Sequence, residues 1–322
     1  MLKCKYIFLD SLYLAKHQCL IPLQYLKLLR PKHWAKNAFL FIPLFFAGEI
    51  FNVEKIMWLL LGFACFSALA SSIYIINDYR DIEADRMHPV KCKRPLASGA
   101  VSKNTALVVF FLLVIGGLGG ACLLGSKFAF VLSIYFVLNL AYSFGLKNIS
   151  ILDIFIVAIG FVLRVKAGGV LSGIAVSEWL MLMVFLLALF MAIAKRRDDI
   201  VLKIASGKDM RVASKGYNMD FLNVSLALVS AVIIVAYLMY TMAPATMERF
   251  HTYRLYYTTI FVIAGLMRYL QITYVENDTG SPTKILYKDR FIQLTIFLWI
   301  LSFYVIIYLM PAILPADKSF FE

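Results

Sequence analysis

The stretch IYIINDYRDIEADRMHP, residues 73–89, joins the end of an apolar run to a group of acidic side chains. Asn77, Asp81 and Asp85 follow one another at intervals of four residues, and Asp78 lies three residues before Asp81. At about 100° per residue, these four side chains share one face of an α-helix. The stretch therefore predicts a membrane helix that ends in a cluster of carboxylates.

Like charges on one helix face repel one another, and the helix dipole disfavours negative charge at a C-terminal end. A hard divalent cation removes this cost, because Mg²⁺ takes oxygen ligands and shares its coordination shell with substrate phosphates. We therefore expect Mg²⁺, with Mn²⁺ as the alternative. Replacing one of the carboxylates by an amide should then leave folding intact. The expected catalytic residues and metal ligands are Asn77, Asp78, Asp81 and Asp85.

Basic side chains follow this cluster in RMHPVKCKRPLASG, residues 86–99. Beside metal-bound carboxylates they would complete a clamp for phosphate groups. Arg94 is the first candidate, because a proline and a glycine fix the loop around it. The competing interpretation is a solvated helix end, in which the acids pair with Arg80, Arg86 and Lys91.

The composition indicates a membrane protein, because 62% of the 322 residues are hydrophobic and only 16% are charged. A soluble domain of this size needs more polar surface. We expect an all-α integral membrane protein in which residues 1–35 form a cytoplasmic segment with an amphipathic helix and residues 36–322 form one catalytic domain. Nine segments are long enough to span a bilayer. They are residues 36–53, 57–77, 104–124, 128–146, 150–168, 178–195, 221–243, 255–275 and 291–313. Pro43 and Gly48 interrupt the first of them.

The distribution of Lys and Arg predicts the orientation. With the N-terminus inside, 25 of the 32 basic residues are cytoplasmic and five lie outside. This asymmetry follows the positive-inside rule and places the C-terminus on the opposite side of the inner or plasma membrane. It also accounts for the net charge of +13 without nucleic acid as a partner. The longest polar loops, 79–103, 196–220 and 276–290, then share the cytoplasmic face, where we expect the chemistry.

The sixth predicted span ends in FMAIAKRRDDI, residues 190–200. We expect this second charged helix end to close the site from the opposite side, with Lys195 and Arg196 on phosphate. Asp198 or Asp199 is an alternative ligand for a second metal ion. The glycine-punctuated basic loop that follows suits a lid over phosphates.

These residues resemble the UbiA superfamily of intramembrane prenyltransferases over almost the whole chain. The motif NxxxDxxxD of that family matches Asn77, Asp81 and Asp85. The resemblance implies nine helices around a central cavity, dependence on Mg²⁺ and a cytoplasmic active site. The chain departs from the aromatic-acceptor branch at the second motif, where a basic stretch from Lys195 to Asp199 replaces DxxxD.

The segments RPKHWAKN (30–37), YSFGLKN (142–148) and GSPTKILYKDR (280–290) resemble the decaprenyl-phosphate phosphoribosyltransferase branch. Its members move 5-phosphoribose from phosphoribosyl diphosphate (PRPP) to a polyprenyl phosphate. Three phosphate-bearing groups need several cations. The expected phosphate-binding residues are Lys32, Lys36, Lys91, Arg94, Lys147, Lys195, Arg196, Arg211 and Lys215, and further substrate contacts are Tyr142, Asp153, Tyr217 and Arg290.

Other interpretations remain open. The same carboxylates would serve prenyl transfer from a prenyl diphosphate to an aromatic acceptor. A lipid flippase or transporter would instead place charges at the bilayer midplane. Asp153 would either hold Lys147 or contact ribose. Arg164 and Lys166 are expected to snorkel to the interface. The sequence leaves the oligomeric state open.

Overall fold

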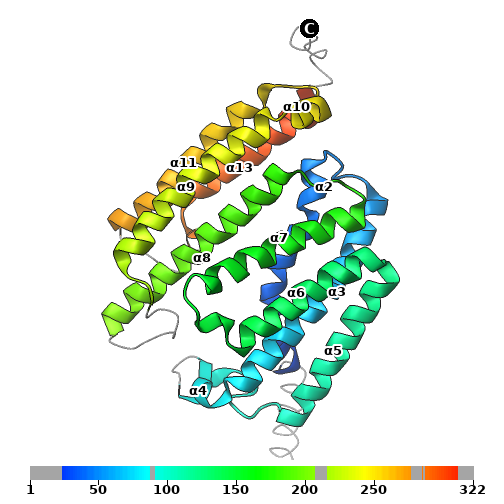
Figure 1. Ribbon diagram of the computed structural model, residues 1–322, viewed down its shortest axis with the longest axis vertical. Helices are drawn as coiled ribbons and strands as arrows, with labels where there is room; N and C mark the ends of the chain where they lie inside the picture. Colours follow the sequence, from blue (N-terminus) through cyan, green and yellow to red (C-terminus); the bar gives the residue numbers. More distant parts are fainter. Residues whose placement is uncertain (1–23, 88–90, 207–215, 277–284, 286, 311–322) are drawn as a thin grey trace, which may run out of the picture. The chain divides into compact units, whose positions relative to one another are not determined.

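The computed structural model describes residues 24–87, 91–206, 216–276, 285 and 287–310. Every regular element in these ranges is helical (Figure 1). Eight helical runs there are long and apolar enough to cross a membrane, which makes this an all-α, multi-pass membrane protein. They are α3 (Val53–Arg80), α5 (Lys103–Leu124), α6 (Ser126–Phe144), α7 (Leu152–Ser172), α8 (Glu178–Ser206), α9 (Met219–Met242), the run of η5 (Arg254–Thr258), α11 (Thr259–Gln271) and η6 (Ile272–Glu276), and the run of α13 (Arg290–Tyr304) and η7 (Val305–Leu309).

Polar caps mark where several of these helices begin. Ser102 accepts a hydrogen bond from the N–H of Thr105 at 3.1 Å before α5. Asn218 accepts one from the N–H of Phe221 at 2.8 Å before α9. Such side chains satisfy N–H groups that have no partner within the helix. A polar residue before an apolar run therefore sets the helix start in both cases.

The end of α8 differs from the predicted span 178–195, because the helix continues to Ser206. Its charged residues pair along the helix. Lys195 Nζ lies 3.7 Å from Asp198 Oδ2, and Arg196 Nη1 lies 3.1 Å from Asp199 Oδ2. Pairs three or four residues apart stabilise a helix, so the polar stretch does not end it.

The predicted first span, residues 36–53, is not one continuous helix. A 3-10 helix, η1 (Pro31–Phe41), leads into the short helix α2 (Ile42–Phe46). Gly48 then takes a left-handed conformation with φ of 75°, which ends the helical path. Eight membrane-spanning runs lie in the described part of the chain, and the ninth stays a prediction.

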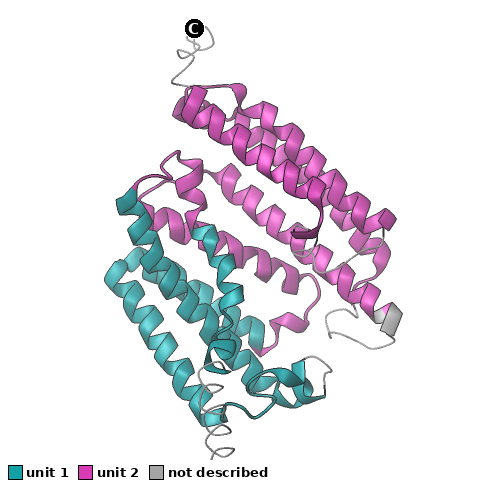
Figure 2. Ribbon diagram, turned by 180° about the vertical axis from the view of Figure 1, so that it is seen from behind, with its two compact units in different colours: residues 1–40, 53–143 teal, residues 41–52, 144–322 magenta. Residues whose placement is uncertain are grey.

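The chain divides into two compact units (Figure 2). Unit 1 holds residues 1–40 and 53–143, and unit 2 holds residues 41–52 and 144–322. The amphipathic helix predicted near the N-terminus falls largely outside the described residues, which begin at position 24. A single catalytic domain from residue 36 onward also stays a prediction.

Small residues shape the packing of unit 1, where α3 lies along α5. A Cβ atom on Gly117 would lie 2.9 Å from Leu69 Cγ, and one on Gly120 would lie 2.8 Å from Cys65 Sγ. Glycine at these two positions therefore lets the helices approach closely, as is common between membrane helices.

In unit 2, α7, α8 and α9 pack in order, and α9, α11 and α13 lie side by side (Figure 1). Tyr237 of α9 joins three elements through its hydroxyl group. The hydroxyl lies 2.5 Å from Thr258 Oγ1 and accepts a hydrogen bond from Trp299 Nε1 at 2.7 Å. This buried network fixes the register of α9 against the C-terminal helices.

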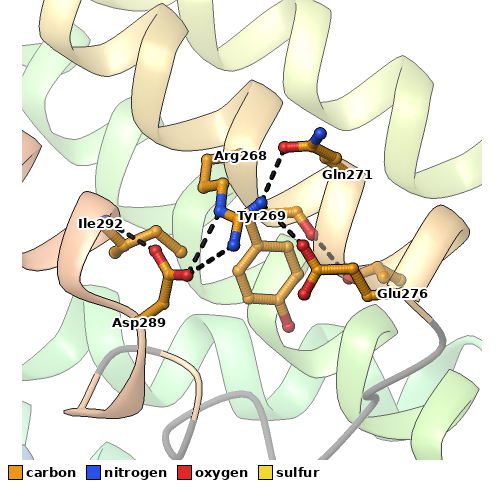
Figure 3. Close-up of polar contacts among 7 residues, drawn as sticks. Arg268, Tyr269, Gln271, Glu276, Asp289 and Ile292 are labelled. Carbon is orange, nitrogen blue, oxygen red and sulfur yellow. Dashed lines mark hydrogen bonds and ion pairs between the residues drawn. The ribbon is translucent and has the colours of Figure 1, made fainter.

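An ion-pair cluster ties α11 to the start of α13 (Figure 3). Arg268 Nη2 lies 2.8 Å from Asp289 Oδ2, and Arg268 Nη1 lies 2.7 Å from Glu276 Oε1. Asp289 Oδ1 also accepts the N–H of Ile292 at 2.9 Å, so this residue caps α13. Its bonds to Arg268 hold the pKa of the Asp289 carboxyl below its usual range. The Asp of the KDR segment therefore has a structural role.

The expected snorkelling of Arg164 is wrong. This side chain is 6% exposed, and its Nη1 donates to the carbonyl of Gly160 at 2.8 Å. Its guanidinium carbon lies 5.3 Å from the Phe161 ring centroid. The local carbonyl and ring therefore compensate a charge that the sequence alone would send to the interface. Lys166 is exposed.

Candidate active site

Two buried aspartates in unit 1 share one arginine nitrogen. Arg94 Nη1 lies 3.0 Å from Asp78 Oδ1 and 2.6 Å from Asp85 Oδ2. Arg30 Nη2 lies 2.5 and 2.6 Å from the two carboxylate oxygens of Asp78. Asp78 and Asp85 are only 2% and 3% exposed. The carboxylates therefore converge on a common cationic atom, with a second cation on Asp78.

The backbone at the end of α3 brings these aspartates to one face, as the spacing predicts. The N–H of Asp81 donates to the carbonyl of Asn77 at 3.1 Å, and the N–H of Asp85 donates to that of Asp81 at 2.8 Å. The helical path thus continues into α4 (Ile82–Arg86). Asp78 and Asp85 are seven residues apart, which is about two turns.

Arg94 is placed by the loop that follows the 3-10 helix η2 (Lys91–Lys93). Its N–H donates to the carbonyl of Lys91 at 2.9 Å. Arg86 in α4 reaches the same loop, where its Nε donates to the carbonyl of Ala97 at 3.1 Å. The two bonds hold the basic loop against the acidic helix end.

Arg30 reaches the cluster from the N-terminal side in a strained conformation. Its φ is 53°, in the left-handed region that non-glycine residues rarely adopt. Ser71 of α3 fixes the surrounding chain, because it donates to the carbonyl of Leu29 at 2.8 Å and accepts from Trp34 Nε1 at 2.9 Å. Backbone strain of this kind costs about 1–3 kcal/mol and gathers at functional sites.

His33 reports the electrostatic potential beside this cluster. Its ring centroid lies 5.0 Å from that of Tyr74, and the guanidinium carbon of Arg30 lies 5.1 Å from the same Tyr74 ring. Burial, and then the charges of Lys36, Arg30 and Arg94, lower the pKa of His33 to about 4. The imidazole is therefore neutral near pH 7, and the surroundings favour an anion.

Unit 2 carries a second buried cluster. Arg196 Nε lies 2.5 Å from Asp153 Oδ2, and Arg196 Nη1 lies 3.1 Å from Asp199 Oδ2. The Tyr217 hydroxyl donates to Asp153 Oδ1 at 2.6 Å. Lys195 lies 3.9 Å from Asp199 Oδ1 and keeps 42% of its side chain exposed. Arg196 thus joins two carboxylates here, as Arg94 does in unit 1.

The backbone of Ile151 completes this second cluster. Its N–H donates to the Tyr217 hydroxyl at 2.6 Å, and its φ is 69°, which is unusual for a β-branched residue. Burial, followed by the hydrogen bond to Asp153, raises the pKa of Tyr217. The phenol therefore stays protonated and acts as a donor to Asp153.

Three predicted roles change in this setting. Tyr217 was expected to contact substrate, but it is buried and its hydroxyl donates to Asp153. Asp153 was expected to hold Lys147 or contact ribose, but its two oxygens bind Arg196 and Tyr217. Arg196 was expected on phosphate, but its guanidinium lies between Asp153 and Asp199 and is 3% exposed. Lys195 is the exposed cation of this pair. The carboxylate partners of Arg196 lie 43 residues upstream and three downstream, so sequence spacing does not reveal the first.

Arg30 is the site residue that the sequence prediction missed. The signal was its place at the start of the RPKHWAKN segment, next to Pro31. Of the residues in the competing pairing, Arg80 Nη1 donates to the carbonyl of Ser143, and Arg86 Nε donates to the carbonyl of Ala97. Among the other predicted residues, Lys32, Lys36 and Arg290 are exposed, Lys91, Tyr142 and Lys147 are half-buried, and Arg211 and Lys215 lie outside the described residues.

The expected cluster of three carboxylates around a metal ion is not found. Within the described ranges, no group of three or more His, Cys, Asp or Glu side chains is arranged to hold one. Asp198 and Asp199 lie near Lys195 instead. The pair of Asp78 and Asp85 nevertheless fits Mg²⁺, because this ion binds through one or two carboxylates when phosphates complete its shell. The shared Arg94 nitrogen marks where both carboxylates already meet a positive charge.

Comparison with known sequences identifies the family. Residues 38–287 match the UbiA prenyltransferase family. The chain belongs to this family. A UbiA homolog from Archaeoglobus fulgidus, solved with GPP and Mg²⁺, has the same fold, with a TM-score of 0.68 at 22% identity over 88% of this chain and 99% of that one.

Two relatives of this UbiA-family chain are decaprenyl-phosphate phosphoribosyltransferases. The Corynebacterium glutamicum protein is 32% identical over 292 residues, which cover 89% of this chain and 87% of that protein. The Mycolicibacterium smegmatis protein is 33% identical over 288 residues, which cover 85% and 89%. The chain is accordingly a membrane-embedded transferase of the UbiA type.

Proposed function

We propose that this transferase moves 5-phosphoribose from PRPP to a polyprenyl phosphate and releases diphosphate. Support comes from the two bacterial relatives, which match most of the chain and carry the name of that activity. The structural observation that carries the proposal is the convergence of Asp78 and Asp85 on Arg94, beside Arg30. This site offers both metal-binding carboxylates and phosphate-binding cations.

The charge of the substrates suits the cations of the two clusters. PRPP carries a diphosphate and a 5-phosphate, and the acceptor adds a third phosphate-bearing group. Guanidinium groups recognise phosphate oxygens well, because their N–H donors form a planar fork. Arg30 and Arg94 are the candidates in unit 1, and Lys195 is the exposed candidate in unit 2.

A divalent metal completes the proposed donor site. The ligands that would hold Mg²⁺, or Mn²⁺ as the alternative, are Asp78 and Asp85, whose carboxylates converge on one atom of Arg94. Such an ion would neutralise charge on the leaving diphosphate. Carboxylates that bind a metal no longer require Arg30 and Arg94 as counter-charges. Both guanidinium groups would then be available to phosphate oxygens.

The proposed reaction is a substitution at C1 of ribose. The bond between C1 and the diphosphate oxygen breaks, and an oxygen of the acceptor phosphate forms the new bond to C1. The acceptor is already an anion, so the reaction needs no strong general base. Fixed cations around the leaving group stabilise the charge that develops there. Arg94 and Arg30 are the residues of this chain proposed for that role.

We place this reaction at the cytoplasmic face. The support is the excess of Lys and Arg in the loops that flank the acidic helix end. The polyprenyl chain then lies in the bilayer while its phosphate reaches the cytoplasmic boundary. This arrangement lets a water-soluble donor meet a lipid acceptor without crossing the membrane.

A product assay tests the proposal. Purified protein is incubated with labelled PRPP, polyprenyl monophosphate and MgCl₂, and the lipid phase is analysed for a labelled glycolipid. We expect wild type to form a product, and we expect EDTA to prevent its formation. Asp85→Asn should form no product, and the exposed variant Glu83→Gln should keep full activity. A parallel mixture contains a prenyl diphosphate such as GPP and 4-hydroxybenzoate. Product from this second mixture alone would overturn the proposed reaction and leave the family assignment intact.

A further inference from the structure

A pocket in unit 2 shares no lining residue with the Arg196 cluster. It has a volume of about 340 Å³ and is lined by Arg197, Asn223, Val224, Ala227 and Tyr274. These residues come from α8, α9 and η6. Val224 and Ala227 are exposed, so the pocket opens on the outer surface of a membrane-spanning helix.

Arg197 presents an unsatisfied hydrogen-bond donor to this pocket. Its side chain is 4% exposed, and its Nε donates to Asn223 Oδ1 at 2.8 Å. Its guanidinium carbon lies 5.5 Å from the ring centroid of Tyr274, whose hydroxyl donates to the Asn223 carbonyl at 2.7 Å. Arg197 Nη1 is buried and has no hydrogen-bond partner among the described residues. A buried charged donor without an acceptor is costly, so the site favours an anionic ligand.

The neighbouring acid, Asp198, does not accept a hydrogen bond from Arg197 Nη1. Asp198 lies beside Arg197 in sequence, but its carboxylate has its own cation, since Asp198 Oδ2 lies 3.7 Å from Lys195 Nζ. Tyr274 and Asn223 orient the Arg197 guanidinium from the other elements. The buried Nη1 atom therefore points to an acceptor from outside the described residues.

The apolar walls indicate the rest of the ligand. Val224 is 67% exposed on α9, and Ala227 follows it by three residues on the same helix face. Arg197 lies five residues before the end of the membrane-spanning part of α8. A ligand here meets a cation at the membrane boundary and hydrocarbon-facing side chains beside it. A lipid with an anionic phosphate head group has this combination.

We propose that the Arg197 pocket binds the phosphate head group of an anionic membrane lipid, with the lipid chain along Val224 and Ala227. The head group accepts hydrogen bonds from the Arg197 fork. The same chemistry has two sources, namely the polyprenyl phosphate acceptor and the anionic phospholipids of the bilayer. The inference does not depend on the proposed reaction, because it concerns binding alone.

Native mass spectrometry of the purified full chain tests this site. Polyprenyl phosphate, polyprenol and phosphatidylglycerol are titrated separately, and the lipids retained per chain are counted. We expect the pocket to retain phosphatidylglycerol or polyprenyl phosphate, but not polyprenol. Arg197→Gln should weaken that binding about tenfold or more, which corresponds to the loss of one charge-assisted contact.

A second pair of variants separates binding from folding. Val224→Trp fills the pocket from an exposed position and leaves Arg197 in place, so it should lower the number of retained lipids by one. Leu228→Trp is the matched control, because Leu228 is 62% exposed on the same helix and does not line the pocket. Loss of polyprenyl phosphate alone would identify the pocket with the acceptor, and loss of phosphatidylglycerol would identify it with the bilayer lipid. Equal retention of each lipid by wild type, Val224→Trp and Arg197→Gln would overturn the proposal, even if the product assay succeeds.

Discussion

Arg94 Nη1 lies 2.6 Å from Asp85 Oδ2, and the same atom lies 3.0 Å from Asp78 Oδ1. This relationship changes the energetics expected from the sequence. Two aspartates that would repel each other on a bare helix end are joined through a common cation. Each buried carboxylate now compensates an arginine, so its removal leaves positive charge without a partner. The site is held together by the groups that we propose for catalysis.

Asp78→Asn should lower thermal stability more than Asp85→Asn, because Asp78 contacts two arginines and Asp85 contacts one. Each lost charge-assisted bond is worth about 1.5–3 kcal/mol. Thermal unfolding in detergent measures the difference, with the exposed Glu83→Gln as control. This replaces the expectation that an amide leaves folding intact. Melting curves that coincide for all three variants and wild type would contradict the paired arrangement.

Tyr217→Phe should destabilise unit 2 by about 1–3 kcal/mol, because Asp153 loses a donor and the N–H of Ile151 loses an acceptor. The aromatic ring, and its packing against Phe221, are preserved. Tyr287→Phe is the matched control, since Tyr287 is 82% exposed. Unfolding midpoints of the two variants are compared under the same conditions. Equal midpoints would show that the hydroxyl contributes nothing to the cluster.

The lowered pKa of His33 predicts that the stability of the protein depends on pH. Its pKa is 6.5 for a free side chain and about 4 in the folded protein. Between these values the unfolded chain binds a proton that the folded chain does not, so the free energy of unfolding falls as the pH drops from 6.5 toward 4. Above pH 6.5 this contribution is absent. Wild type should therefore lose more stability than His33→Gln between pH 7.5 and pH 5. Parallel losses in the two proteins would rule out the perturbed imidazole.

Glu83 and Lys127 test the predicted orientation, since both side chains are exposed at opposite ends of predicted spans. The five native cysteines are first replaced. Single cysteines at 83 and 127 are then treated in intact cells with a membrane-impermeant thiol reagent. Position 127 should react, and position 83 should react only after lysis. The opposite pattern would reverse the topology and move the proposed site to the outer face.

The membrane helices could be predicted from the sequence because their apolar runs are long. Residues 104–124, for example, agree with α5 (Lys103–Leu124). The segment 36–53 is less apolar, because it contains Lys36 and Glu49, and the interruption predicted at Gly48 is a left-handed turn in the structure. At the end of α8, hydropathy predicted a stop, whereas ion pairs along the helix let it continue to Ser206. Hydropathy therefore predicted the central part of each span. It did not predict the helix ends that depend on backbone geometry or on ion pairs.

The candidate site, too, could be predicted from the sequence only in part. The common face of Asp78 and Asp85 followed from helical periodicity, and Arg94 from its loop. Arg30, the partner of Asp78, lies 48 residues before it and has a strained backbone conformation. No local sequence pattern therefore predicts their contact. Tyr217 lies 64 residues after Asp153. Contacts across such separations depend on tertiary packing, which a single sequence does not display.

The unsatisfied Nη1 of Arg197 was likewise invisible in the sequence, where three consecutive basic residues look alike. The fold gives each of them a different environment. Lys195 is partly exposed, Arg196 lies between carboxylates, and Arg197 faces a pocket. Adjacent helix positions are about 100° apart, which sends identical charges to different neighbours.

The central claim is that Asp78, Asp85 and Arg94 form the donor site, and equilibrium binding of radiolabelled PRPP tests it most directly. Binding is measured with Mg²⁺ and with EDTA, for wild type, Asp78→Asn combined with Asp85→Asn, Arg94→Gln and the exposed control Lys93→Gln. We predict Mg²⁺-dependent binding that the double variant loses and that Arg94→Gln weakens at least about tenfold, while Lys93→Gln binds as wild type does. Binding that is equal in EDTA and in all four proteins would contradict the account.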